Sequence, residues 1–192
     1  MKKLSLVLLA LVLAACAAPA QPTSVSLEPA PTVAEATAQP IEPSFEATTY
    51  QDAEGRFSLE YPASWQILGG ESGARGDYVQ IASWDPGAAG FESLPAGESL
   101  LQITVYQWDP KGDLAARIEM RRTAFDNSGI TILEEDEVSF PGGPPAVRMM
   151  LASNGVSYLT YFFVLGDEYL EITGQGDLPL LHAVMQTFEY GN

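Results

Sequence analysis

Hydrophobic and polar positions alternate in short runs along residues 49–192, and residues typical of turns separate the runs. In the first run Phe57, Leu59 and Tyr61 fall at period two, which predicts a strand that Pro62 ends. The same pattern predicts further strands at 65–68, 77–83, 99–107, 130–140, 146–152, 156–165 and 168–173.

The run 156–165 differs from the others because it is apolar on both of its alternating faces. A strand that is covered on one side only would carry polar residues on its other side. Asn154 and Gly155 precede this run and suit the positive backbone angles of a tight hairpin turn. The sequence therefore predicts an antiparallel meander in a sheet that is packed on both faces.

Two segments have the spacing of helices. Asp113 is placed to cap a helix over 114–125, which repeats Leu114, Ile118, Arg121 and Phe125. A second helix follows Asp177, has Pro179 in its first turn, and carries a stripe of Leu181, Val184, Met185 and Phe188. The expected fold class is α+β, with a helix at the C-terminal end.

One motif gives a family resemblance. Residues 55–65 read Gly-Arg-Phe-Ser-Leu-Glu-Tyr-Pro-Ala-Ser-Trp, which resembles the opening of PsbP-like domains: Phe-Ser-aliphatic-x-Tyr-Pro, two residues, then Trp. Thr187-Phe188 is similar to the end of such domains. The resemblance implies an α/β/α sandwich on a central, mostly antiparallel sheet, and an accessory or binding role rather than catalysis.

The first 15 residues are typical of an export signal, with Lys2 and Lys3 before an apolar stretch over 4–13. This stretch is too short to span a bilayer as a stable helix. Small residues come directly before Cys16, and this arrangement resembles the lipobox of bacterial lipoproteins. We therefore predict a signal peptide over 1–15 and lipid attachment, such as palmitate, at Cys16.

A lipid at Cys16 would hold the protein on the extracytoplasmic side of the cell envelope. Each buried methylene contributes about 0.8 kcal/mol, so two or more acyl chains give durable anchoring. An aspartate directly after the lipidated cysteine resembles an inner-membrane retention signal. This chain has Ala17 at that position, which favours the outer membrane if the host has one. Residues 16–48 contain six prolines and no lysine or arginine. We predict a disordered tether there and one globular domain over 49–192.

The chain is strongly acidic, with a formal charge of −16 that becomes −18 when Lys2 and Lys3 leave with the signal peptide. Such a surface repels phosphate backbones, so nucleic acid is excluded as a partner. It also keeps an exported protein soluble. Cys16 is the only cysteine, so no disulfide forms within the chain.

Few residues are candidates for catalysis or metal binding. His182 is the only histidine and lies beside the stripe of the last helix, without a recognisable nucleophile. The acidic run 134–137 alternates between the faces of a strand, whereas calcium needs its ligands around one point. Asp109 and Asp113 lack calcium-loop spacing, so Asp113 is interpreted as a helix cap.

Three aromatic residues lie in or beside predicted loops, at what we expect to be one end of the sheet. They form a possible recognition surface, although ordinary packing is the alternative: Trp84, Phe91 and Trp108.

The sequence favours a non-enzymatic, membrane-tethered module that binds an unidentified protein or small molecule, and it predicts no cofactor and no catalytic residue. Two alternatives stay open. One is a hydrolase of envelope or extracellular polymers that uses acidic residues, and the other is an accessory protein that binds divalent metal weakly.

Overall fold

The computed structural model describes residues 43–73, 76–87, 94–107 and 113–191. The chain divides into two units, 1–37 and 38–192, and every described residue belongs to the second. The predicted signal peptide, Cys16 and most of the predicted tether lie outside the described residues. Within the described part of the chain, no helix is long and apolar enough to cross a membrane.

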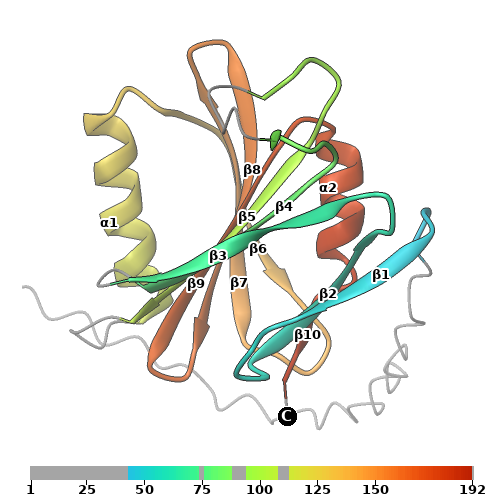
Figure 1. The fold of residues 1–192 in the computed structure, drawn as a ribbon. Helices are drawn as coiled ribbons and strands as arrows, with labels where there is room; N and C mark the ends of the chain where they lie inside the picture. The colour runs from blue at the N-terminus through green and yellow to red at the C-terminus, as the bar shows by residue number, and fades with distance from the viewer. Residues whose placement is uncertain (1–42, 74–75, 88–93, 108–112, 192) are drawn as a thin grey trace, which may run out of the picture. The chain divides into compact units, whose positions relative to one another are not determined.

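The domain contains one large and one small antiparallel sheet. The large sheet has seven strands in the order β3-β4-β5-β9-β8-β7-β6, and the small sheet has three in the order β1-β2-β10. The strands are β1 (Ala47–Gln51), β2 (Phe57–Pro62), β3 (Gln66–Gly73), β4 (Gly76–Ala82), β5 (Leu100–Gln107), β6 (Thr131–Ser139), β7 (Pro145–Ser153), β8 (Val156–Leu165), β9 (Glu168–Gln175) and β10 (Glu189–Tyr190). The helices are α1 (Leu114–Asn127) and α2 (Leu178–Met185), which lie on opposite sides of the large sheet (Figure 1).

Strand β8 is packed on both faces, as its sequence predicts. Leu159, Tyr161 and Phe163 belong to a core cluster that includes α2 and β2. Phe162, which points the other way, belongs to a second cluster beneath α1. The α+β class and the antiparallel central sheet are therefore confirmed.

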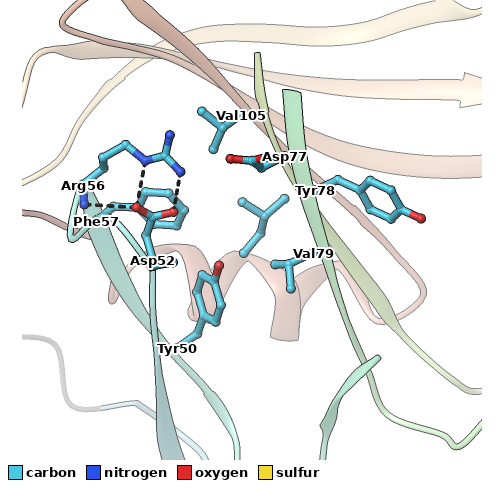
Figure 2. A pocket seen from close by; sticks show the side chains of 10 residues that line it. Tyr50, Asp52, Arg56, Phe57, Asp77, Tyr78, Val79 and Val105 are labelled. Carbon is cyan, nitrogen blue, oxygen red and sulfur yellow. Dashed lines mark hydrogen bonds and ion pairs between the residues drawn. The ribbon is translucent and has the colours of Figure 1, made fainter. Parts of the chain in front are cut away.

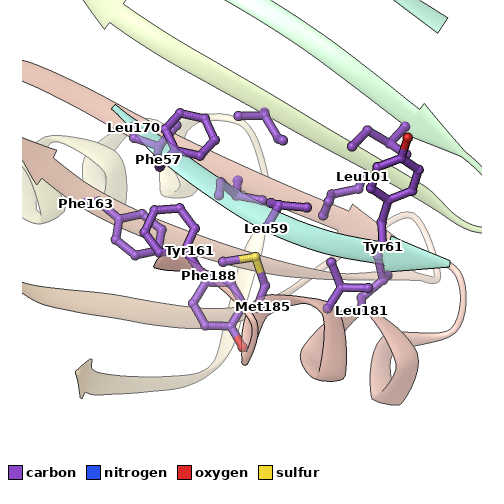
Figure 3. Packing of buried hydrophobic residues seen from close by; sticks show 14 of the residues in the cluster. Phe57, Leu59, Tyr61, Leu101, Tyr161, Phe163, Leu170, Leu181, Met185 and Phe188 are labelled. Atoms are coloured by element: carbon purple, nitrogen blue, oxygen red, sulfur yellow. The ribbon is translucent and has the colours of Figure 1, made fainter. Parts of the chain in front are cut away.

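Aromatic stacking joins the small sheet to the large one. Phe188, just after α2, has its ring centroid 5.5 Å from that of Phe57 on β2 and 4.6 Å from that of Phe163 on β8. Both pairs are stacked. Figure 3 shows Leu59 and Met185 in the same cluster. This packing explains why β2 can lie outside the central sheet and still be buried.

Local backbone requirements match the sequence at two places. Asn154 and Gly155 adopt φ of 51° and 78°, as the tight turn between β7 and β8 requires. Gly174 on β9 allows α2 to approach closely, because a Cβ there would lie 2.8 Å from Leu181 Cδ1.

The sequence did not predict strands β1 and β10, which flank β2 in the small sheet. Strand β1 pairs with β2 but alternates only between exposed and half-buried positions, and β10 has two residues, so neither carries a strong hydrophobic pattern. One outer layer is therefore α2 with a small sheet, rather than helix alone. Strand β1 begins at Ala47 and Phe45 packs against the core, so the predicted tether, which ends at residue 48, overlaps the domain.

Replacement of Trp65 by alanine tests the core. Trp65 is 8% exposed and belongs to the cluster of Phe57 and Phe188. The change should lower the free energy of unfolding by about 3–5 kcal/mol, a large part of the roughly 5–15 kcal/mol typical of a domain. Denaturant titration measures this loss. Leu133→Ala is the control, because Leu133 is 53% exposed and should change stability by no more than about 0.5 kcal/mol. Equal stability of the two variants would contradict the described core.

Candidate functional site

Helix α1 covers one face of the large sheet with an unusual set of buried residues. Asp113 caps it as predicted, and its Oδ1 accepts a hydrogen bond from the Ala116 backbone N–H at 2.8 Å. Ile118 and Phe125 provide the apolar contact with the sheet. Arg117 is also buried, at 8% exposure. The helix therefore brings cationic side chains into a mostly apolar interface.

A partly enclosed cavity of about 130 Å³ lies between α1 and strands β5 and β9. We call it the α1 cavity, and its lining residues are Tyr106, Arg117, Met120, Arg121, Ala124, Tyr169 and Glu171. Tyr106 and Tyr169 face each other across the two strands, with ring centroids 5.7 Å apart. Met120 is 46% exposed, so part of the lining is open to solvent.

An ion pair crosses the α1 cavity. Arg121 Nη2 donates to Glu171 Oε1, and the two side chains are 30% and 11% exposed. Three buried polar atoms that belong to the lining have no hydrogen-bond partner: Arg121 Nε, Glu171 Oε2 and the Tyr169 hydroxyl. An unsatisfied buried polar group costs about 1–3 kcal/mol. This concentration of three such atoms in one cavity marks it as a place where a polar molecule could bind.

Burial has the largest effect on the pKa values of Glu171 and Tyr169 in the α1 cavity. It raises the pKa of Glu171 above the ordinary value of 4.5, although Arg121 and the Thr173 hydroxyl act to lower it. Burial and the charge of Glu171 also raise the pKa of Tyr169. The Arg117 guanidinium lies over the Tyr169 ring, 5.2 Å from its centroid, and adds positive charge to the site.

This arrangement suits binding better than catalysis. The lining offers one carboxylate, Glu171, and the described lining contains no serine, cysteine or histidine. Nucleophilic and two-carboxylate mechanisms both need a second catalytic group within reach. The α1 cavity can instead supply hydrogen bonds and aromatic contact to a small polar group.

A second hollow lies between the small and large sheets. It is a crevice of about 210 Å³ whose lining includes Tyr50, Asp52, Arg56 and Asp77. Figure 2 shows Asp77 and Val105 facing Arg56 across it.

The polar groups of this crevice are largely occupied. Arg56 Nε and Nη2 donate to the two carboxylate oxygens of Asp52, each at 2.7 Å, and Nη1 donates to Glu168 Oε2 at 3.0 Å. Burial alone would raise the pKa of Asp52, but hydrogen bonds and charge from Arg56 lower it overall. The network fixes the turn between β1 and β2 against the start of β9, so its role is structural.

His182 lies on α2 in contact with Tyr161, which belongs to the core. Its Nδ1 shares a hydrogen bond of 2.6 Å with the Tyr161 hydroxyl. Burial lowers the pKa of His182 and raises that of Tyr161 to about 12.

The acidic run 134–137 lies exposed on the edge strand β6. Glu134 and Asp136 pair with Arg148, and Glu135 pairs with Arg122. In the described part of the chain, no three or more histidine, cysteine or acidic residues are grouped to hold a metal ion.

Of the three aromatic residues in the predicted recognition surface, Trp84 lies within the described residues. Trp84 follows the end of β4, where Ala82 pairs with Leu100 at the start of β5. Gln107, the residue before Trp108, is at the other end of β5, a strand of eight residues that spans roughly 25 Å. Phe91 and Trp108 themselves lie outside the described residues. The surface therefore stays a prediction for the separate loops.

Sequence reasoning missed the α1 cavity, although two signals were visible. Arg121 falls in the apolar stripe of the predicted helix, and Glu171 falls within an apolar strand. Each is a charge at a position that the pattern marks as buried. A buried charge requires a partner, so the two positions could have been paired with each other.

No protein-family model matches this chain, and no curated protein matches it. Its fold is similar to that of the cyanobacterial PsbP protein CyanoP from Synechocystis, with a TM-score of 0.52, 12% identity, and coverage of 75% of this chain and 92% of that one. It is also similar to the Ran-binding protein Mog1p of Saccharomyces cerevisiae, with a TM-score of 0.50, 13% identity, and coverage of 77% and 96%. These likenesses confirm the PsbP-like fold that residues 55–65 suggested.

The raised pKa of Glu171 predicts a particular pH dependence of stability, which a Glu171→Gln variant isolates. In the unfolded chain Glu171 loses its proton near pH 4.5, whereas the folded state holds it to higher pH. The free energy of unfolding of the wild type relative to the variant should therefore fall as the pH rises from 4.5 through the raised folded pKa, and then level off. Denaturant unfolding at several pH values measures this difference. A difference that is level above pH 4.5 and falls as the pH drops below 4.5 would show that the ion pair with Arg121 outweighs burial.

Proposed function

We propose that this protein is a lipid-anchored accessory module on the extracytoplasmic side of the cell envelope, and that it binds its ligand or partner in the α1 cavity without catalysing a reaction. The observation that carries the proposal is the set of three buried polar atoms without partners on Arg121, Tyr169 and Glu171. A folded protein rarely leaves such atoms unsatisfied. Their convergence on one cavity is explained if a bound group completes their hydrogen bonds.

The rest of the architecture suits a binding scaffold. Tyr106, Tyr169 and Glu171 lie on paired strands inside a seven-stranded sheet, so their spacing is fixed by backbone hydrogen bonds. Mog1p, which has a similar fold, is named as a Ran-binding protein. This analogy supports a protein partner as one class of ligand, although a shared fold hosts many functions.

The hydrolase alternative has less support from the described residues. A glycosidase-type mechanism needs one carboxyl group whose pKa is raised, so that it can act as the acid, opposite a second carboxylate. The α1 cavity has the first feature in Glu171 but no second acid in its described lining. The crevice has two acids, Asp52 and Asp77, but Arg56 holds the pKa of Asp52 low.

The anchor is proposed from the sequence alone. Cys16 follows an apolar stretch and small residues that resemble a lipobox, and residues 17–42 would separate the anchor from the described domain. The acidic charge opposes contact of the domain with anionic lipid headgroups. A lipid at Cys16 would therefore keep the domain near the envelope without requiring contact between the domain and the headgroups.

Substitution of the lipid-bearing sulfur tests the anchor. Cys16→Ser should give an uncleaved or soluble product that no longer incorporates a radioactive fatty acid, because diacylglyceryl transfer requires the thiol. Membrane fractionation and labelling in the native host measure this. The wild-type chain, expressed in the same way, is the control. Membrane retention together with labelling of the serine variant would contradict lipidation at this residue.

Site-specific photo-crosslinking tests binding at the α1 cavity. A benzophenone amino acid at Met120, which lines the cavity, should trap a partner or ligand from the native envelope. The same amino acid at Ile67, on β3, is a matched control because both residues are 46% exposed. Mass spectrometry of the adducts compares the two positions. Equal adducts at both positions, or none at Met120, would contradict the proposed binding site.

A further inference from the structure

We infer that the α1 cavity recognises an uncharged ligand through a carboxamide group, whose oxygen accepts from Arg121 Nε–H and whose N–H donates to Glu171 Oε2. This inference rests on the proposed binding function and names the chemical class of the ligand.

Two of the three unpartnered atoms are a donor and an acceptor on the same ion pair. Arg121 Nε carries a hydrogen and can only donate. Glu171 Oε2 accepts when the carboxyl is ionised. Because Arg121 Nη2 and Glu171 Oε1 already bind each other, the remaining two atoms belong to one ion pair. A carboxamide offers an acceptor and a donor side by side, which is the complement of such a pair.

Charge balance separates a carboxamide from the charged alternatives. Arg121 and Glu171 neutralise each other, so a neutral ligand leaves their ion pair undisturbed. A carboxylate ligand would place its charge beside Glu171, and an ammonium ligand would place its charge beside Arg121. Arg117 adds positive charge and favours an anion, but its guanidinium lies over the Tyr169 ring. A carboxylate ligand is therefore the main alternative to a carboxamide.

The size and walls of the cavity restrict the rest of the ligand. Its volume of about 130 Å³ equals roughly four water molecules in the liquid. Tyr106, Met120 and Ala124 contribute apolar surface to the lining. A short aliphatic group attached to the carboxamide fits this space. The Tyr169 hydroxyl, which is buried and has no partner, can give or take a further hydrogen bond.

Titration with two small probes of the same shape tests the inference. Propionamide and sodium propionate differ only in the group that would face Arg121 and Glu171. The protein is the chain from residue 16 with Cys16→Ser, labelled with ¹³C in its methionine methyl groups, so that Met120 reports on the cavity by NMR. Propionamide should shift the Met120 signal and bind about ten-fold or more tightly than propionate, because the propionate charge would lie beside the Glu171 carboxylate.

A Glu171→Gln variant should reverse this preference. The introduced glutamine side chain would keep its oxygen towards Arg121 and turn its NH₂ group into the cavity, which replaces the open acceptor by a donor. Affinity for propionamide should fall about ten-fold, and affinity for propionate should rise above that of the wild type. Glu135→Gln is the matched control, because Glu135 pairs with Arg122 outside the cavity lining and its loss should change neither affinity.

A third variant keeps the test decisive if Glu171→Gln does not fold. Tyr169→Phe removes only the hydroxyl and should weaken propionamide binding several-fold while the fold is retained. Tighter binding of propionate than of propionamide by the wild type would overturn the carboxamide assignment. So would the absence of any Met120 shift with either probe, which would indicate that the cavity holds water only. Photo-crosslinking at Met120 is independent of both probes, so failure of the ligand class can be distinguished from failure of the binding function.

Discussion

The stacked rings of Phe57, Phe188 and Phe163 are the interaction on which the domain depends. Phe188 lies between the small sheet and the large sheet, with ring centroids 5.5 Å from Phe57 and 4.6 Å from Phe163. Because β2 shares no backbone hydrogen bonds with the large sheet, side-chain packing must hold the two sheets together. Aromatic pairs of this kind contribute about 0.5–1.5 kcal/mol each beyond the area that they bury. The position of α2 follows, since Phe188 comes directly after it and Gly174 lets the helix approach β9 closely.

The opposite face of the large sheet is covered in a different way, and the candidate site follows from that difference. Tyr169, Glu171 and Thr173 point towards the α1 side of β9, while Leu170 and Ile172 point into the larger core. Helix α1 places Arg117 and Arg121, as well as apolar residues, against this polar face. An interface with charges on both sides cannot close as tightly as an aromatic core. The α1 cavity and its unsatisfied atoms result from this chemistry.

Much of the large sheet and strand β2 of the small sheet could be predicted from the sequence, whereas strands β1 and β10 and the α1 cavity could not. Phe57, Leu59 and Tyr61 gave a clear period of two, and the apolar run of β8 predicted that the sheet is covered on both faces. Strand β1 gave no such pattern because its core contact is carried by Tyr50 and by Phe45 before it, and β10 forms only where its residues pair with Ser58 and Phe57. The α1 cavity depends on the contact of Arg121 with Glu171, which are 50 residues apart. Periodicity within one element cannot reveal a contact between two elements, and only the mismatch of a charge in an apolar pattern pointed to it.

The similarity to CyanoP and Mog1p shows why the function must be argued from the α1 cavity rather than from the fold. The identities of 12% and 13% leave most side chains different, so the likeness shows a shared backbone arrangement only. The groups on which a function can be argued are local to this chain: Arg121 is paired with Glu171 Oε1, and Arg121 Nε and Glu171 Oε2 have no hydrogen-bond partner. A tyrosine at position 169 adds a hydroxyl that the core itself does not need. Burial makes each of these groups costly to leave unsatisfied, and the same burial would make a hydrogen bond to a ligand stronger than in water. The residues that weaken the packing of α1 on the sheet are therefore the ones that would give the domain its selectivity.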